Sequence, residues 1–98
     1  MNSVRFHIEA EAELNEAVSF YEALVPGLGK SLTAEVKKTV RLVQAHPAAG
    51  QNVSARLKKS LVHRFPYSLI YSVDAQSILI LAVAHHRRRP GYWRKRQT

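Results

Sequence analysis

The run Ile78-Leu79-Ile80-Leu81-Ala82-Val83-Ala84 decides the fold, because it has no polar face. A strand that is apolar on both faces is typical of a central position in a sheet, covered on both sides. Before it, residues 65–73 place large apolar side chains at one parity and Ser68 and Ser72 at the other, which predicts a strand with one polar face. Residues 74–77 have the length and polarity of a hairpin turn. The centre of the domain is therefore predicted to be a hairpin of two neighbouring strands.

The N-terminal half predicts a strand followed by two helices. Residues 4–8 alternate apolar and polar side chains, which is the period of a half-buried strand. From Ala10, apolar residues recur every three or four positions until Pro26-Gly27, and a second such stripe runs over residues 28–43. His46-Pro47 ends the second helix, because a residue before proline is pushed away from helical angles.

The remaining segments complete an α+β domain. Residues 48–54 are predicted to be a loop, and residues 56–64 a twisted basic strand or a pair of short strands. We therefore expect an N-terminal strand and an α-helical hairpin packed on one face of a mostly antiparallel sheet of about four strands. A short basic and aromatic segment follows at the C-terminus. The other face of the sheet is expected to be polar and to carry Ser68, Ser72, Arg64 and His86.

Bulk composition fits one domain over residues 1–98, since the 98 residues are 46% hydrophobic. The chain has no cysteine, which excludes disulfides and thiolate metal sites. Its longest apolar run is too short to cross a bilayer, and its first residues are unlike a secretory signal. We expect a cytoplasmic protein that does not contact membranes.

Charge is strongly divided along the chain. Residues 1–35 carry six acids and two bases, whereas residues 36–98 carry thirteen bases and the single acid Asp74, which gives net charges of −4 and +12. Clustered Lys and Arg attract a polyanion and release its counterions on binding. The basic half therefore indicates a partner that carries phosphate or an acidic protein segment.

The last residues combine cations with aromatic rings. In the segment Ala84-His85-His86-Arg87-Arg88-Arg89-Pro90-Gly91-Tyr92-Trp93-Arg94-Lys95-Arg96, the cations can hold phosphates and the rings can stack on bases. The alternative is a solvated tail whose rings cover the edge of the core. Both interpretations stay open at the level of sequence.

Neither a metal nor a cofactor is predicted. The five histidines are scattered, and adjacent His85 and His86 point to opposite faces if the strand continues. The four acids Glu9, Glu11, Glu13 and Glu16 are interpreted as a solvated helix face.

Four segments form an ordered set across nearly the whole chain: Ala17-Val18-Ser19-Phe20-Tyr21-Glu22, Pro26-Gly27-Leu28-Gly29, Leu61-Val62-His63-Arg64-Phe65-Pro66-Tyr67-Ser68-Leu69-Ile70-Tyr71 and Ile80-Leu81-Ala82-Val83-Ala84-His85-His86-Arg87-Arg88-Arg89-Pro90-Gly91-Tyr92-Trp93. This set resembles the RelE/ParE superfamily of toxins from type II toxin-antitoxin modules, often called plasmid stabilisation proteins. The resemblance implies a compact α+β toxin that an acidic, partly disordered antitoxin segment wraps and neutralises in a hetero-oligomer. It also implies one of two targets: RelE-like relatives cleave mRNA in the ribosome, and ParE-like relatives inhibit DNA gyrase without evident catalysis.

The residues supply candidates for each role that RNA cleavage requires. Cleaving RNA through its 2′-hydroxyl requires groups that exchange protons and cations that hold the phosphate. His86, or its neighbour His85, could exchange protons, Tyr92 could orient the hydroxyl or stack a base, and Arg64 could clamp the phosphate. The predicted catalytic residues are therefore His86, Tyr92 and Arg64. The predicted residues for binding phosphate or the target are Lys58, Lys59, Arg87, Arg88 and Trp93.

The resemblance to the cleaving relatives is incomplete. Tyr92 falls where they place a functional tyrosine, and His86 falls near the place of an arginine. Ser68 falls where they place another important arginine, and Lys58 and Lys59 lie near their basic strand with a longer spacing to Tyr67. Ribonuclease, gyrase inhibitor, degenerate toxin and non-toxic nucleic-acid-binding module therefore remain alternatives.

Overall fold

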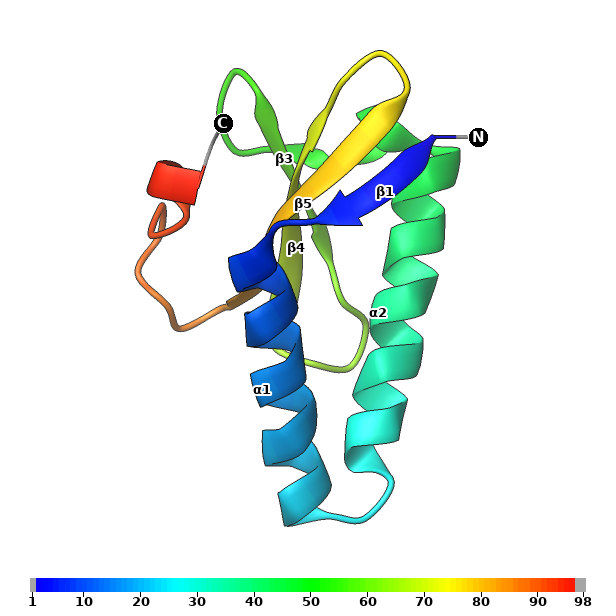
Figure 1. Cartoon of the computed structure of the whole chain (residues 1–98), viewed down its shortest axis with the longest axis vertical. Coiled ribbons are helices and arrows are strands. Elements are labelled where there is room, and N and C mark those ends of the chain that lie inside the picture. Colours follow the sequence, from blue (N-terminus) through cyan, green and yellow to red (C-terminus); the bar gives the residue numbers. More distant parts are fainter. Residues whose placement is uncertain (1, 97–98) are drawn as a thin grey trace.

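A five-stranded sheet carries two helices on one of its faces (Figure 1). The structure is a computed structural model that describes residues 2–96. The order of strands across the sheet is β1-β5-β4-β3-β2. The strands are β1 (Ser3–Phe6), β2 (Gln51–Asn52), β3 (Leu57–Leu61), β4 (Tyr67–Val73) and β5 (Ser77–His85). The helices are α1 (Ile8–Leu24), α2 (Leu28–Ala45) and the short 3-10 turns η1 (Pro47–Ala49) and η2 (Arg94–Arg96).

Strand β5 lies inside the sheet, as its apolar run predicts. It pairs antiparallel with β4 on one side and parallel with β1 on the other. Ile78 and Ile80 face the helices, while Leu81 and Ala82 belong to a second cluster on the opposite side. The prediction of a mostly antiparallel α+β fold is confirmed, because only the pairing with β1 is parallel among the described strands.

Tyr71 is fully buried in the core between the helices and the sheet. Its hydroxyl donates to the carbonyl of Pro47 at 3.2 Å, which ties the turn after α2 to strand β4. A side-chain carbon at Gly50 would collide with the Tyr71 hydroxyl, so this position accepts glycine alone. Residues 51–52 then pair with β3, so the prediction of an unstructured loop over 48–54 was wrong for this short strand.

The face of the sheet opposite the helices is covered in part, contrary to the expected polar surface. Trp93 folds back onto it and is 8% exposed. It forms an apolar cluster with Leu57, Ile70, Leu81, Ala82 and Ala84. Ser68 is therefore buried, since it lies on the same face as this cluster. We refer to the whole of this face as the outer face.

The tip of the helical hairpin is fixed by a carboxylate. Glu22, near the end of α1, accepts from the backbone N–H of Gly27 at 2.8 Å and of Gly29 at 3.0 Å. These N–H groups belong to the start of α2 and have no partner within the helix. Gly27 has a positive φ of 90°, which glycine adopts without strain. Among residues 2–96, neither helix is long and apolar enough to span a bilayer.

Replacing Glu22 by Gln is expected to make the melting temperature less dependent on pH. The hydrogen bond from Gly27, above all, holds the pKa of Glu22 below its ordinary value of 4.5. A lowered folded-state pKa contributes stability above the ordinary pKa, and the contribution is lost as pH falls through the folded pKa. The wild type should therefore melt higher than Glu22→Gln at pH 7, and the difference should shrink below about pH 4. Thermal melts at both pH values measure this, and Glu11→Gln on the exposed face of α1 is the control.

Candidate target-binding site

One carboxylate holds the C-terminal segment against the rest of the domain. Glu13 on α1 accepts from the Tyr92 hydroxyl at 2.7 Å and from the backbone N–H of Val83 at 3.0 Å. It also accepts two bonds from the Arg96 guanidinium, at 2.9 and 3.0 Å. Its side chain is only 16% exposed, and that of Arg96 only 10%. The prediction that Glu13 belongs to a solvated helix face was wrong.

The side chains of Glu13 and Arg96 bond to backbone groups of β5 on the part of its edge where no strand pairs with it. Strand β1 ends at Phe6, which pairs with Ile80, so the far half of β5 has no strand beside it on that edge. Buried backbone groups require partners. Glu13 accepts from Val83 N–H, and Arg96 donates to the carbonyl of Leu81 at 3.2 Å. Side chains therefore complete the edge of the sheet where β1 stops.

Tyr92 and Trp93 anchor the same segment by packing. The guanidinium carbon of Arg88 lies 3.9 Å from the centre of the Tyr92 ring, and that of Arg96 lies 5.0 Å from it. Burial, together with the hydrogen bond to Glu13, raises the pKa of the Tyr92 phenol far above its ordinary value. Tyr92 is therefore a neutral hydrogen-bond donor in the structure, and Trp93 is part of a core.

Between these anchors and β5, the chain forms an exposed loop of residues 86–91, which we call the arginine loop. Arg87, Arg88 and Arg89 are all exposed on it. The loop starts with a turn in which His85 Nδ1 accepts from the N–H of Arg87 at 3.0 Å. It ends at Gly91, whose φ of 81° is in the left-handed region that favours glycine. The arginines are thus presented from a segment that is fixed at both ends.

His86 and Arg64 lie at the same end of the sheet as the arginine loop. The backbone N–H of His86 donates to the carbonyl of Pro66 at 2.9 Å, and its Nε2 lies 2.9 Å from Ser68 Oγ. Arg64, in the turn between β3 and β4, has a φ of 72°. A non-glycine residue in this region costs about 1 kcal/mol. His85 instead packs its ring on Tyr67, so the two histidines face opposite sides of the sheet, as predicted.

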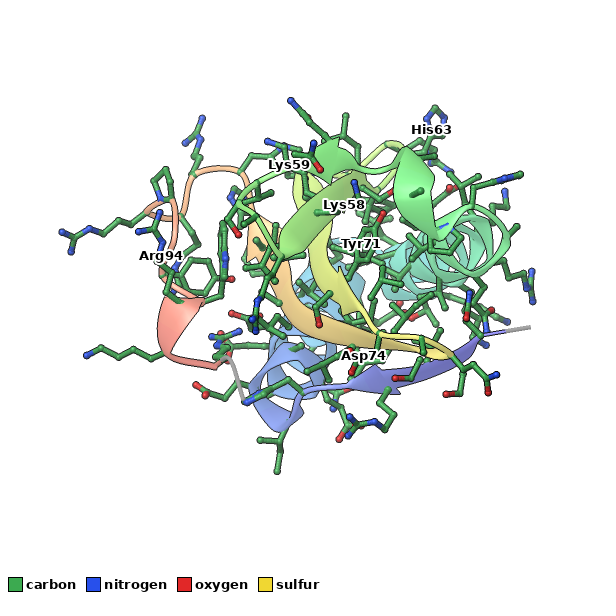
Figure 2. All side chains as sticks on the ribbon, turned by 90° about the horizontal axis from the view of Figure 1, so that it is seen from above. Lys58, Lys59, His63, Tyr71, Asp74 and Arg94 are labelled. Atoms are coloured by element: carbon green, nitrogen blue, oxygen red, sulfur yellow. The ribbon has the colours of Figure 1, made fainter. Side chains whose placement is uncertain are left out.

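The two predicted lysines lie further along the sheet. Lys58 and Lys59 are on β3, opposite Tyr71 and Ile70 of β4 (Figure 2). The Nζ of Lys58 donates to Asn52 Oδ1 at 2.7 Å. The structure therefore brings together Arg64, His86 and the arginine loop at one end of the sheet. Tyr92 also lies beside the arginine loop, because the Arg88 guanidinium stacks on its ring, but the Tyr92 hydroxyl is directed to Glu13 on α1.

No pattern in the sequence indicates that Glu13 and Arg96 are partners. They are separated by 83 positions, and each lies in a segment of similar charged residues. Glu13 differs from Glu9, Glu11 and Glu16 only in facing the bare half of the β5 edge. A prediction would have needed the length of β1 and its register on β5.

The two predicted proton-transfer groups, His86 and Tyr92, have hydrogen-bond partners on different sides of the sheet. Tyr92 donates to Glu13 on the helix side, whereas His86 contacts Ser68 on the outer face. No cluster of three or more His, Asp or Glu that could bind a metal occurs among residues 2–96. What the described geometry does present is a fixed cationic surface.

The family model described as ParE toxin of the type II toxin-antitoxin system parDE matches residues 4–90. The chain therefore belongs to the ParE toxin family. Among solved structures, it is similar to a chain described as the chromosomal ParDE TA system from P. aeruginosa, with a TM-score of 0.75 and 22% identity over 87% of this chain and 96% of that chain. No curated protein sequence matches.

Replacing Glu13 by Ala is expected to lower the free energy of unfolding by about 3 kcal/mol, because the buried Arg96 guanidinium loses both hydrogen bonds to a carboxylate and keeps only a 3.8 Å ion pair with the exposed Glu9. Tyr92→Phe should cost about 1 kcal/mol, since it removes one hydrogen bond and keeps the ring. Urea unfolding measures both changes, with Glu16→Ala on the exposed part of α1 as the control. Equal stabilities of Glu13→Ala and Glu16→Ala would contradict the central role of Glu13.

Proposed function

We propose that this toxin inhibits growth by binding DNA gyrase through the arginine loop, without catalysing a reaction itself. The observation that carries the proposal is the fixation of this loop. Glu13 and the buried Trp93 hold its C-terminal end, and β5 holds its start. Fixing a cationic loop before binding removes the entropy cost of ordering it in the complex. We place this activity in the cytoplasm.

Several features favour binding over RNA cleavage. The phenol of Tyr92 has a raised pKa and a filled hydrogen bond to Glu13, so it is a poor proton acceptor. Ser68 is buried and cannot replace an arginine that stabilises charge on a phosphate. The family match to ParE toxins agrees with a mode of action that needs no catalytic constellation.

Charge reversal in the arginine loop is expected to abolish inhibition of gyrase. The double variant Arg87→Glu/Arg88→Glu should raise the concentration needed to block DNA supercoiling by at least about tenfold, since like charges across an interface cost several kcal/mol. The variant Lys37→Glu/Arg41→Glu on the exposed face of α2 makes the same change in net charge and is the matched control. Supercoiling assays with purified gyrase measure both.

Two outcomes would contradict this proposal. Equal loss of inhibition in the two double variants would show that net charge, and not the arginine loop, determines the effect. Ribosome-dependent cleavage of mRNA that is abolished by His86→Ala, with gyrase unaffected, would support the alternative target. Growth that is unaffected by expression of the toxin would support a degenerate toxin or a non-toxic binding module.

We also propose that a cognate antitoxin neutralises the toxin by covering the arginine loop with an acidic segment. Arg64 and Arg87 are exposed at one end of the sheet, where negative side chains could pair with both. A disordered acidic segment can wrap such a surface and occlude it.

Binding of the antitoxin is expected to depend on salt and on the loop. Arg87→Glu/Arg88→Glu should weaken the complex by at least about tenfold, with Lys37→Glu/Arg41→Glu as the control. Calorimetric titration of the toxin with the protein encoded next to it measures the affinity. An unchanged affinity in the loop variant would place the antitoxin elsewhere on the toxin.

A further inference from the structure

A second cationic site lies at the other end of the outer face, away from the arginine loop. An open groove with a volume of about 770 Å³ is lined there by Arg5 and Arg56, which come from β1 and from the turn before β3. Figure 2 shows Asp74 at the end of β4, at the end of the sheet from which the molecule is viewed. The residues that define this site are far apart in sequence, and the sheet brings them together.

Strand register explains why these side chains converge. Arg5 is aligned with Leu79 in the parallel pair of β1 and β5, and Leu57 is opposite Ser72 in the antiparallel pair of β3 and β4. Partners in register lie on the same face of a sheet. The groove begins where the cluster around Trp93 ends, because Leu57 and Leu81 belong to that cluster and also line the groove.

The floor and rim of the groove differ in chemistry. Leu57, Leu79 and Leu81 form an apolar floor, and the hydroxyls of Ser72 and Ser77 lie beside it. Within residues 2–96, neither Arg5 nor Arg56 makes an ion pair. Asp74 supplies a single negative charge at the rim. The two arginines and this aspartate give the groove a net charge of +1 beside an apolar surface.

This combination specifies the ligand. The two arginines favour phosphate, and the leucines favour a flat, weakly hydrated group that covers them. Asp74 repels phosphate but accepts hydrogen bonds from hydroxyl or amino groups. A nucleotide carries all three features. We propose that the groove binds a nucleotide unit, with its phosphate on the cations and its base over the leucines.

The nucleotide can come from two sources with the same chemistry, either a free nucleotide or one unit of a single strand of RNA. The site does not depend on the identity of the toxin's target, since binding is measured on the toxin alone. If the toxin does not bind a nucleotide, the gyrase proposal is unaffected. If the toxin does not inhibit gyrase, the nucleotide proposal is unaffected.

The test uses ADP and a fluorescent ten-nucleotide RNA as probes of the purified toxin. The variant Arg5→Gln/Arg56→Gln should weaken binding of ADP at least about tenfold, while the matched variant Lys37→Gln/Arg41→Gln changes it less than about twofold. For the RNA, the slope of log K against log salt should decrease by about 0.7 for each groove cation removed. RNA that binds far more tightly than ADP would assign the strand as the source, and ADP that binds as tightly as RNA would assign the free nucleotide.

The variant Asp74→Asn distinguishes binding of a nucleotide from binding of a bare anion. Removing the negative charge should strengthen binding of pyrophosphate, whereas loss of the acceptor should weaken binding of ADP. The proposal would be overturned if ADP did not bind at about 1 mM, a concentration at which even a weak affinity is detected. Equal losses in the two double variants would also overturn it, because they would show attraction to overall positive charge alone. Circular dichroism of each variant establishes that the fold is retained.

Discussion

The hydrogen bonds of Glu13 are the constraint on which the rest of the structure depends. This carboxylate is in a helix, and it accepts from a strand, a tyrosine and an arginine that belong to three other parts of the chain. A buried carboxylate is costly unless its charge is paired and its oxygens are hydrogen-bonded. Arg96 supplies the charge and the remaining donors fill the oxygens. The C-terminal segment is therefore part of the domain, although its composition resembles that of a disordered tail.

The fixed segment has consequences for both faces of the sheet. On the edge of β5, Glu13 and Arg96 replace the strand that β1 is too short to provide. On the outer face, Trp93 covers a second apolar cluster and buries Ser68. The same segment leaves three arginines exposed at one end. The C-terminal segment therefore both stabilises the domain and presents the basic surface.

The protein thus has two cationic regions with different character. The arginine loop has exposed guanidinium groups on a turn, which suits contact with a large partner. The groove around Arg5 and Arg56 has an apolar floor, which suits a smaller ligand. The apolar cluster around Trp93 lies on the same face.

The sequence by itself determined the class of fold and the order of its elements. Periodicity identified the two helices and strand β4, since burial of one face imposes a regular spacing on neighbouring residues. The unbroken apolar run identified strand β5, which is covered on both faces. Periodicity missed the two-residue strand β2, because so short a segment has no period. Charge indicated the basic half, and the resemblance indicated the family, which the match over residues 4–90 confirms. The tertiary structure alone decided which acid is buried and which rings are core. Glu13 meets Arg96 across 83 positions, and Arg5 meets Arg56 across the sheet, because strand length and register, which local sequence does not encode, set these distances.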